Sequence, residues 1–160
     1  IKRWTVFCPL VAELRDPAMR PRHWSMLMSL CGKNAQVTDD VLLRDMWNME
    51  LHKFPAEVED IAERAKQEAK MEATISKLQR IWSGLAFEFE EHKSSPVWMM
   101  NLKEEDVETL EENQVQVQNM FASRFLAAFE QEAISWQKTL SSISEITTLL
   151  MEVERAWDFL

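Results

Sequence analysis

The chain has 160 residues, of which 46% are apolar and 28% charged, so it can bury a core and is not expected to be disordered. Its net charge of −9 disfavours nucleic acid and the acidic microtubule surface as direct partners, because both repel an acidic domain. No apolar run approaches the length of about 18 residues that a membrane span needs. Cys8 and Cys31 indicate reduced intracellular thiols rather than a disulfide framework.

Three short helices are predicted at the N-terminal end. Residues 1–14 repeat apolar side chains at helical spacing, which is typical of one packed helix face. Asp16 before Pro17 is a favoured N-cap and first helical residue, so a second helix is expected from Pro17, with Gly32 as its left-handed C-terminal cap. A third helix is expected over residues 38–49, because the acidic residues at its start favour the positive end of a helix.

One long amphipathic helix, or two in tandem, is expected over residues 50–85. Apolar positions recur at spacings of three and four up to Ala69 and again from Met71. The slip between these two residues indicates a bend or a change of packing partner. Gly84 is expected to end the helix.

A β-hairpin is predicted over residues 86–100, because Phe87 and Phe89 alternate with smaller or acidic residues and a segment of turn composition follows. Trp98 and Met99 would then point to opposite faces, so that one side of the hairpin rests on helices and the other presents apolar surface. The alternative is a loop with a few apolar anchors.

Helices are expected again over residues 101–160. Asn101 with Glu104 has the spacing of a capping box, and the helix that it opens is predicted to reach as far as Trp136. Ser142 with Glu145 repeats that signal. A coiled-coil-like seam follows, with apolar residues alternately three and four apart: Ile143, Ile146, Leu150, Val153, Trp157 and Leu160.

The predicted architecture is mostly α: an elongated array of antiparallel long helices with one inserted β-hairpin at about residues 85–100. The first residue is Ile1 rather than Met, and the apolar seam still runs at Leu160. We therefore expect a fragment of a longer polypeptide, truncated within a helix.

No catalytic, cofactor-binding or metal site is predicted. A phosphate-binding loop needs two glycines a few residues apart before Lys and Ser or Thr, whereas Gly32 and Gly84 are the only glycines. The three histidines, His23, His52 and His92, lack ligand spacing. The acidic runs are expected to be solvated.

A basic cluster marks the second predicted helix: Arg15, Arg20, Arg22 and His23. The arginines Arg20 and Arg22 are expected to bridge neighbouring helices, with Trp24 in the core. The alternative is that the arginines face an acidic partner.

Six segments of the sequence carry specific motifs: PAMRPRHW at 17–24, WNMELHKFPAEVEDIAERAKQE at 47–68, LQRIWSGLAFEFEEHK at 78–93, LEENQVQVQNM at 110–120, SWQKTLSSI at 135–143 and VERAWDFL at 153–160. In this order they resemble the linker of dynein heavy chains, in its N-terminal half, and most of all that of axonemal outer-arm chains. The first contains the Arg-His-Trp motif of the family at Arg22, His23 and Trp24, with Arg20 before it, and Leu27 follows it.

The resemblance implies that residues 1–160 are a single piece of the linker domain, a non-catalytic mechanical lever in a microtubule motor of the cytoskeleton, in the axoneme of a cilium or flagellum. Within it, residues 1–49 would hold the motif helices, 50–85 the long helix, 86–100 the hairpin and 101–160 the last helices. ATP and Mg²⁺ would be bound elsewhere in the parent chain.

The implied partners are the AAA+ ring of the same heavy chain, the rest of the linker and tail, and other dynein subunits. No direct contact with nucleic acid, membrane or microtubule is expected. The candidate contacts with the ring are Phe87, Phe89, Trp98 and Met99; the alternative is that the linker's own helices cover both faces of the hairpin.

Two other functions are alternatives to a mechanical lever. A helical scaffold, such as a spectrin-like bundle that binds a partner helix, would explain the composition and the seam, but it would have no period-two insertion at 85–100. An enzyme assembled across helices would need clustered titratable groups, and no spacing suggests one.

Overall fold

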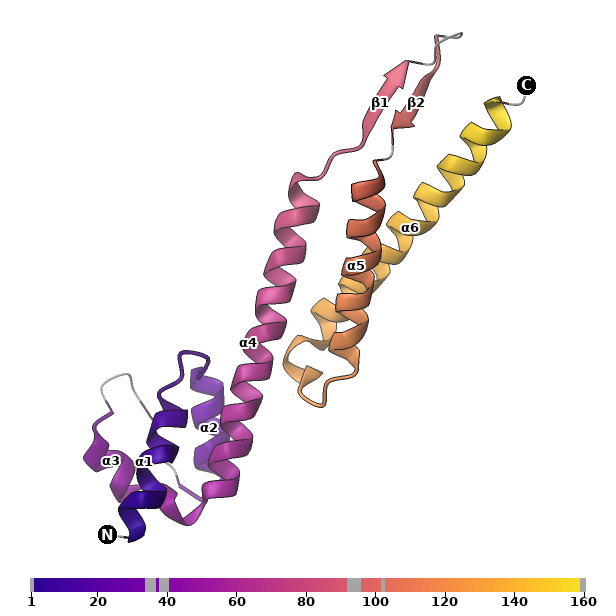
Figure 1. The fold of residues 1–160 in the computed structure, drawn as a ribbon. Helices are drawn as coiled ribbons and strands as arrows, with labels where there is room; N and C mark the ends of the chain where they lie inside the picture. Colours follow the sequence, from indigo (N-terminus) through magenta and orange to yellow (C-terminus); the bar gives the residue numbers. More distant parts are fainter. Residues whose placement is uncertain (1, 34–36, 38–40, 92–95, 102, 159–160) are drawn as a thin grey trace. The chain divides into compact units, whose positions relative to one another are not determined.

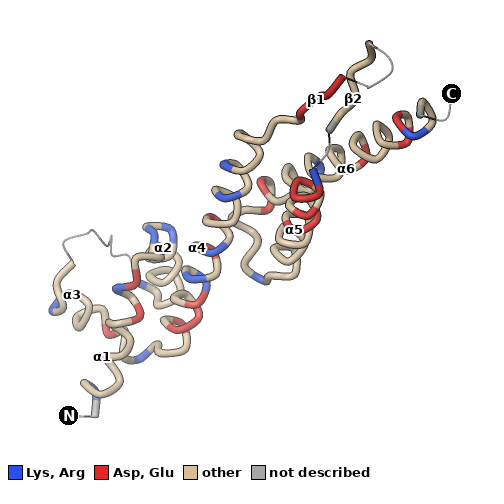
Figure 2. Tube along the Cα trace, turned by 45° about the horizontal axis from the view of Figure 1, so that its top comes forward, with Lys and Arg blue, Asp and Glu red and all other residues tan. Residues whose placement is uncertain are grey.

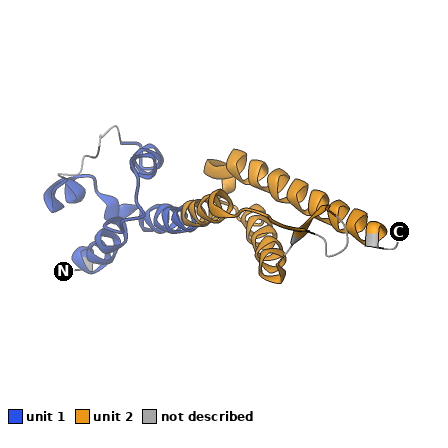
Figure 3. Ribbon diagram, turned by 90° about the horizontal axis from the view of Figure 1, so that it is seen from above, with its two compact units in different colours: residues 1–70 blue, residues 71–160 orange. Residues whose placement is uncertain are grey.

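The computed structural model is mostly α-helical, as predicted, with one two-stranded sheet (Figure 1). The residues that it describes are 2–33, 37, 41–91, 96–101 and 103–158. The chain divides into two compact units, which we call unit 1 (residues 1–70) and unit 2 (residues 71–160) (Figure 3).

Unit 1 is built from short helices around one apolar core. Its elements are α1 (Lys2–Leu14), α2 (Pro21–Leu30), α3 (Leu43–Asn48), the 3-10 helix η1 (Leu51–Lys53) and the first part of α4 (Pro55–Gly84). Phe7 of α1, Leu27 of α2 and Val58 of α4 are fully buried in this core. Burial of a side chain of this size stabilises the fold by roughly 1.5–3 kcal/mol.

The helix α2 begins at Pro21, so the prediction that it begins at Pro17 is wrong. A proline disfavours helical geometry in the residue before it, and Arg20 is indeed extended, with φ −109° and ψ 162°. Asp16 therefore caps a turn instead of a helix: its carboxylate accepts the Ala18 N–H at 2.9 Å.

The end of α2 follows the prediction. Gly32 has φ +66°, the left-handed conformation that favours glycine. The Lys33 N–H donates to the Met28 carbonyl at 2.8 Å and the Gly32 N–H donates to the Ser29 carbonyl at 3.1 Å. These are the two bonds of a Schellman cap, which satisfy carbonyls that the helix leaves unpaired.

The third predicted helix is present but shorter. It begins at Leu43, and residues 38–40, where its start was predicted, lie outside the described residues. Trp47 of this helix stacks on Trp4, with 4.5 Å between ring centroids, and meets Phe7 edge-on at 5.1 Å. His52 lies against the same indole at 5.0 Å, so this aromatic cluster joins α1, α3 and η1.

The long predicted helix is one element, α4, which Gly84 ends as expected. Val58 and Ile61 are buried in the core of unit 1, whereas Met71 and Leu78 are buried in unit 2. The division between the units falls after residue 70, so the predicted change of packing partner at Ala69–Met71 is confirmed.

Unit 2 packs two antiparallel helices with the end of α4 (Figure 1). Its further elements are β1 (Glu88–Glu91), β2 (Trp98–Asn101), α5 (Glu104–Phe121), the 3-10 helix η2 (Leu126–Phe129) and α6 (Glu130–Asp158). Leu78, Leu110, Val117 and Leu140 form one buried cluster. Met71, Met120, Phe125 and Ala133 form a second.

The predicted capping box at Asn101 is wrong, because Asn101 is the last residue of β2 and pairs with Glu88. Lys103 is the N-cap of α5 instead. Three acidic residues, at 104–106, occupy the first turn, where the helix dipole favours negative charge.

The prediction of a helix that reaches Trp136 is also wrong, since α5 ends at Phe121. The Ser123 hydroxyl accepts the Phe125 N–H at 3.2 Å, which stabilises a turn, and Phe125 is buried beyond it. The second predicted capping signal, at 142–145, lies inside α6 and starts no helix.

The hairpin is confirmed. The strands β1 and β2 are antiparallel, with Phe89 opposite Met100 and Glu91 opposite Trp98. Directly opposed residues share a face, and alternate residues of a strand share one too. Phe89, Trp98 and Met100 therefore lie on one face of the hairpin, together with Glu91 at the end of β1. We call this face its apolar face.

Candidate functional site

The Arg-His-Trp segment forms a buried polar cluster with Glu68 of α4, inside unit 1. His23 and Glu68 are 0% and 1% exposed. The Nδ1 atom of His23 accepts the Arg20 N–H at 3.0 Å, and its Nε2 lies 2.9 Å from Oε2 of Glu68. A backbone N–H can only donate, so Nδ1 carries the lone pair and Nε2 carries the hydrogen that the carboxylate accepts.

Arg22 completes this polar cluster. Its Nε and Nη2 atoms lie 2.8 and 2.7 Å from Oε2 of Glu68. The buried carboxylate thus has donors from two side chains of α2, which offsets the large cost of removing it from water. This arrangement fixes the first turn of α2 on α4, and both nitrogens of His23 are already used, so none is free for a metal.

The residues of the predicted motif have different roles in the structure. Arg22 bridges two helices, as expected, and Leu27 is fully buried. Trp24 is only partly buried and packs at the edge of the core. The prediction that it is a core residue is therefore only partly correct. His23 is the buried member, because its two ring nitrogens both find partners.

Glu68 is the residue that the sequence analysis missed. It follows Ile61 and Ala65 at spacings of four and three, on the buried face of α4. A carboxylate at an apolar position of a helix is a signal that a cation or donor must lie opposite.

The predicted hairpin contacts lie in unit 2 and are largely open to solvent. Phe87, Phe89 and Trp98 are 37%, 56% and 66% exposed, although Met100 on the same face as Phe89 is buried. Met99 lies on the opposite face, as predicted. The expectation that one face packs and the other is exposed is wrong, because the apolar face itself is partly covered and partly open.

Two polar contacts hold the hairpin in unit 2. The carboxylate of Glu154 in α6 accepts the Met100 N–H, which lies in β2. The ammonium of Lys103 lies 2.7 Å from Oε1 of Glu88, and this hydrogen bond raises the pKa of Lys103. The hairpin is thus attached to α6 at one strand, while the aromatic rings of the apolar face keep their exposure.

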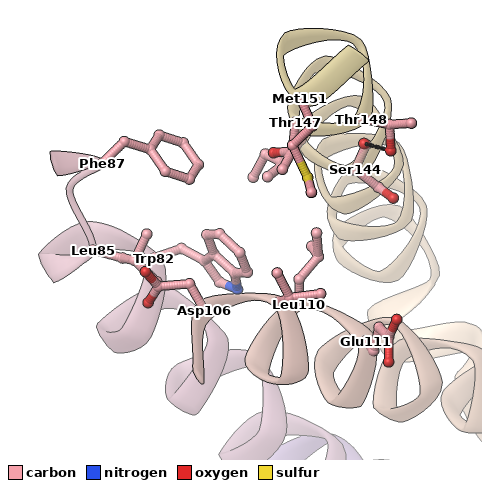
Figure 4. Close-up of a pocket in the computed structure, with 12 residues that line it drawn as sticks. Trp82, Leu85, Phe87, Asp106, Leu110, Glu111, Ser144, Thr147, Thr148 and Met151 are labelled. Carbon is pink, nitrogen blue, oxygen red and sulfur yellow. Dashed lines mark hydrogen bonds between the residues drawn. The ribbon is translucent and has the colours of Figure 1, made fainter. Parts of the chain in front are cut away.

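An apolar groove lies beneath the start of the hairpin, between the end of α4, α5 and α6 (Figure 4). Its cavity volume is about 170 Å³, which is the size that accepts one aromatic ring. Phe87 and Trp82 lie across the opening from Thr147 and Met151. The lining holds two carboxylates, Asp106 and Glu111, but no histidine, cysteine or lysine, so it fits an apolar side chain better than a reacting substrate.

The described residues contain no group of three or more His, Cys, Asp or Glu side chains that could hold a metal ion. Within the same part of the chain, no helix has both the length and the apolar content to cross a membrane. Cys8 is exposed and Cys31 is buried, and both are free thiols. Burial raises the pKa of the Cys31 thiol, which keeps it protonated and a poor nucleophile.

Comparison with known proteins gives matches over the whole chain. Residues 1–160 match the family described as "Dynein heavy chain, N-terminal region 2". The chain is 44% identical to the flagellar outer-arm dynein alpha chain of Chlamydomonas reinhardtii over 161 residues, 100% of this chain and 4% of that protein. It is 38% identical to the dynein axonemal heavy chain 9 of Homo sapiens over 150 residues, 94% of this chain and 3% of the relative.

A third relative, the flagellar outer-arm dynein beta chain of Chlamydomonas reinhardtii, is 29% identical over 160 residues. That match covers 98% of this chain and 4% of the relative. The chain therefore spans no more than about 4% of the length of these three relatives.

Proposed function

The chain belongs to the dynein heavy chain family, as its N-terminal region 2, and from this premise we propose that it is a non-catalytic segment of the motor's linker. In this role it is a lever that couples ATP-driven changes of the AAA+ ring to movement. ATP and Mg²⁺ are bound elsewhere in the parent heavy chain, which is the ATP-hydrolysing motor.

The make-up of the helices supports a mechanical role. The helix α4 has 30 residues, with Pro55 as its first residue and Gly84 as its last. No proline or glycine lies between these two residues, and sharp kinks in helices arise mostly at proline or glycine. The buried cluster at Glu68 and the apolar clusters of each unit add packing that resists bending.

The observation that carries the proposal is the exposed apolar face of the hairpin. Phe89 and Trp98 expose more than half of their surface although the sheet has only two strands, which are marginally stable by themselves. A small aromatic surface suits a contact that forms and breaks in each cycle. We assign the AAA+ ring of the same heavy chain as its partner, through Phe87, Phe89 and Trp98. Met99 lies on the other face, so it contacts the ring only if the ring covers both faces of the hairpin.

Further partners follow from the family. The rest of the linker and tail, and other dynein subunits, are proposed to contact this segment in the parent complex. The relatives named above are flagellar outer-arm and axonemal chains, so we place this protein in the axoneme of a cilium or flagellum.

The second candidate is a helical scaffold of the spectrin type, which binds a partner helix. The seam predicted on α6 favours it, because this helix exposes apolar residues. The hairpin favours the linker, because a simple helical bundle needs no such insertion.

The test uses the intact heavy chain with Trp98→Asp, which places a charge on the apolar face. The matched control is Val115→Asp on α5, because Val115 is 56% exposed but lies outside the hairpin. We expect microtubule gliding to slow at least about twofold in the Trp98 variant, with basal ATPase and thermal stability kept. If gliding and the coupling of ATPase to movement both remain at wild-type levels, the contact with the ring is disproved.

The non-catalytic role is tested separately, by calorimetric titration of the 160-residue chain with Mg-ATP. We expect no binding, because the two glycines cannot form a phosphate loop. Micromolar affinity in a chain of native helical content would contradict the proposal.

A further inference from the structure

The second half of α6 exposes a continuous apolar stripe in unit 2. Its five members are between 40% and 65% exposed: Ile146, Leu149, Leu150, Val153 and Trp157. We call these residues the α6 stripe. Leu140 and Thr147, on another side of the same helix, are buried. With 100° of rotation per residue, the stripe lies roughly 110° around α6 from the residues that face α5.

The spacing within the α6 stripe specifies the kind of partner. Ile146, Leu150, Val153 and Trp157 follow one another at four, three and four residues. This repeat keeps apolar side chains on one line along a helix, where they fit the holes of a second helix. A strand or a loop offers no matching row of holes, so the shape favours an amphipathic α-helix.

Acidic residues border the α6 stripe. By helical rotation, the exposed Glu145 and Glu152 lie along one edge. Glu154 lies along the other edge, but its carboxylate already accepts the Met100 N–H of β2. Arg155 lies on the opposite side of the helix, roughly 180° from the stripe. Charged residues at the edges of a helical seam select a partner with opposite charge there.

The rest of unit 2 adds further negative charge around the α6 stripe. Residues 71–160 hold 16 of the 27 acidic and 7 of the 18 basic residues, so the full net charge of −9 belongs to unit 2. Figure 2 shows the concentration of acidic residues along the first turns of α5. Such a field attracts basic segments and repels acidic ones over distances of about 10 Å.

From these observations we infer that the α6 stripe docks an amphipathic helix with Lys and Arg along the edge of its apolar seam that meets Glu145 and Glu152, supplied by another part of the same dynein heavy chain. This inference rests on the seam and its acidic edge, not on the contact between the hairpin and the ring. The two can therefore fail independently.

Size and charge favour a partner in the same chain. The stripe has five apolar residues, whereas a stable interface between separate proteins uses about 20–30 residues on each side. Covalent linkage compensates for a small interface, because it raises the effective concentration of the partner. A second copy of this surface in an antiparallel pair would bring the two Glu145 and Glu152 edges against each other, and like charges oppose that contact.

The test places a photo-crosslinking amino acid at Val153 in the intact heavy chain, with the same amino acid at Arg155 as the control. Val153 is the most exposed member of the stripe, at 65%. The masses of the crosslinked peptides identify the partner segment, and the mobility of the heavy chain separates a link within one chain from a link between two.

We expect Val153, and not Arg155, to crosslink within one heavy chain to a segment with apolar residues three and four apart and more basic than acidic residues at its edges. A crosslink to a second copy, to another subunit or to a segment with acidic edges overturns the inference. A yield no higher than that of the Arg155 control also overturns it.

A charge variant tests the acidic edges directly. Glu152→Lys is expected to lower the crosslinking yield from Val153 about threefold to tenfold, because it replaces attraction by repulsion at one edge. Glu108→Lys is the matched control, since Glu108 is also an exposed glutamate within a helix of unit 2 but lies on α5. Equal yields in the two variants would show that charge does not select the partner.

Discussion

The two units of this chain differ in net charge and in how their exposed apolar residues are arranged. Residues 1–70 carry equal numbers of acidic and basic residues, and their buried carboxylate, Glu68, is paired with Arg22 and His23. Residues 71–160 carry the whole net charge and leave apolar rows open on the hairpin and on α6. Unit 1 also exposes large apolar side chains, among them Leu30, Leu42 and Leu43. What distinguishes unit 2 is therefore its negative charge together with a continuous apolar row along α6, which is typical of a surface that binds other elements.

The largest expected effect is on stability, and it distinguishes a residue in the core of unit 2 from one in the exposed α6 stripe. Leu78→Ala should lower the free energy of unfolding by about 2–5 kcal/mol, because Leu78 is fully buried and the change leaves a cavity. Leu149→Ala should change it by less than about 0.5 kcal/mol, because Leu149 is 59% exposed. Denaturant unfolding of the 160-residue chain measures both. Similar losses would mean that the stripe is covered within this chain.

The next effect concerns the buried cluster of unit 1. Glu68→Ala should cost about 3 kcal/mol, because it leaves the His23 ring N–H buried without its acceptor. Hydrogen exchange of the α2 amides measures the local loss, with the exposed Glu59→Ala on the same helix as the control. Equal protection of α2 in both variants would contradict the role given to Glu68.

A smaller effect distinguishes the two glycines. Gly32→Ala in unit 1 should cost about 1 kcal/mol, because alanine is strained at φ +66° even though no atom lies within 4 Å of its added Cβ. Gly84→Ala, also with open space around the Cβ but without a positive φ, should be neutral or slightly stabilising. Thermal unfolding of both variants provides the measurement, and a reversed order would disprove the cap.

The smallest effect is a pH dependence in unit 1. The hydrogen bond from Lys53 to Glu50, at 2.6 Å, lowers the pKa of Glu50 below 4.5. A carboxyl whose pKa is lowered on folding stabilises the protein above its unfolded pKa, and that stabilisation is lost as the pH falls through its folded pKa. The melting temperature of Glu50→Gln should thus be slightly lower than wild type at pH 7 and should converge with it below pH 4.5. A difference that persists in acid would contradict this assignment.

The sequence could predict what local signals control. Gly84 ends α4, and the alternation of Phe87 and Phe89 with smaller or acidic residues predicts the hairpin. The start of α2 was misplaced because Asp16 and Pro17 give a strong local signal, while the effect of Pro21 on Arg20 overrides it.

Long-range contacts explain what the sequence could not predict. The partners of Glu68 lie 45 and 46 residues away, and only folding brings them together. The break after Phe121 has neither glycine nor proline to mark it. The seam on α6 was predicted from its spacing, but the same spacing is expected for a covered and an open stripe, so its exposure comes only from the structure.

The most direct test of the account is hydrogen exchange on the intact heavy chain, compared between its nucleotide-free and ATP-bound states. The account predicts that amides of β1 and β2 exchange more slowly in one of the two states, because the apolar face of the hairpin is then covered. Amides of α1 and α2 should exchange alike in both, since the buried side chains of these helices pack in the core of unit 1. Equal exchange of the hairpin in both states, or a change confined to unit 1, would contradict it.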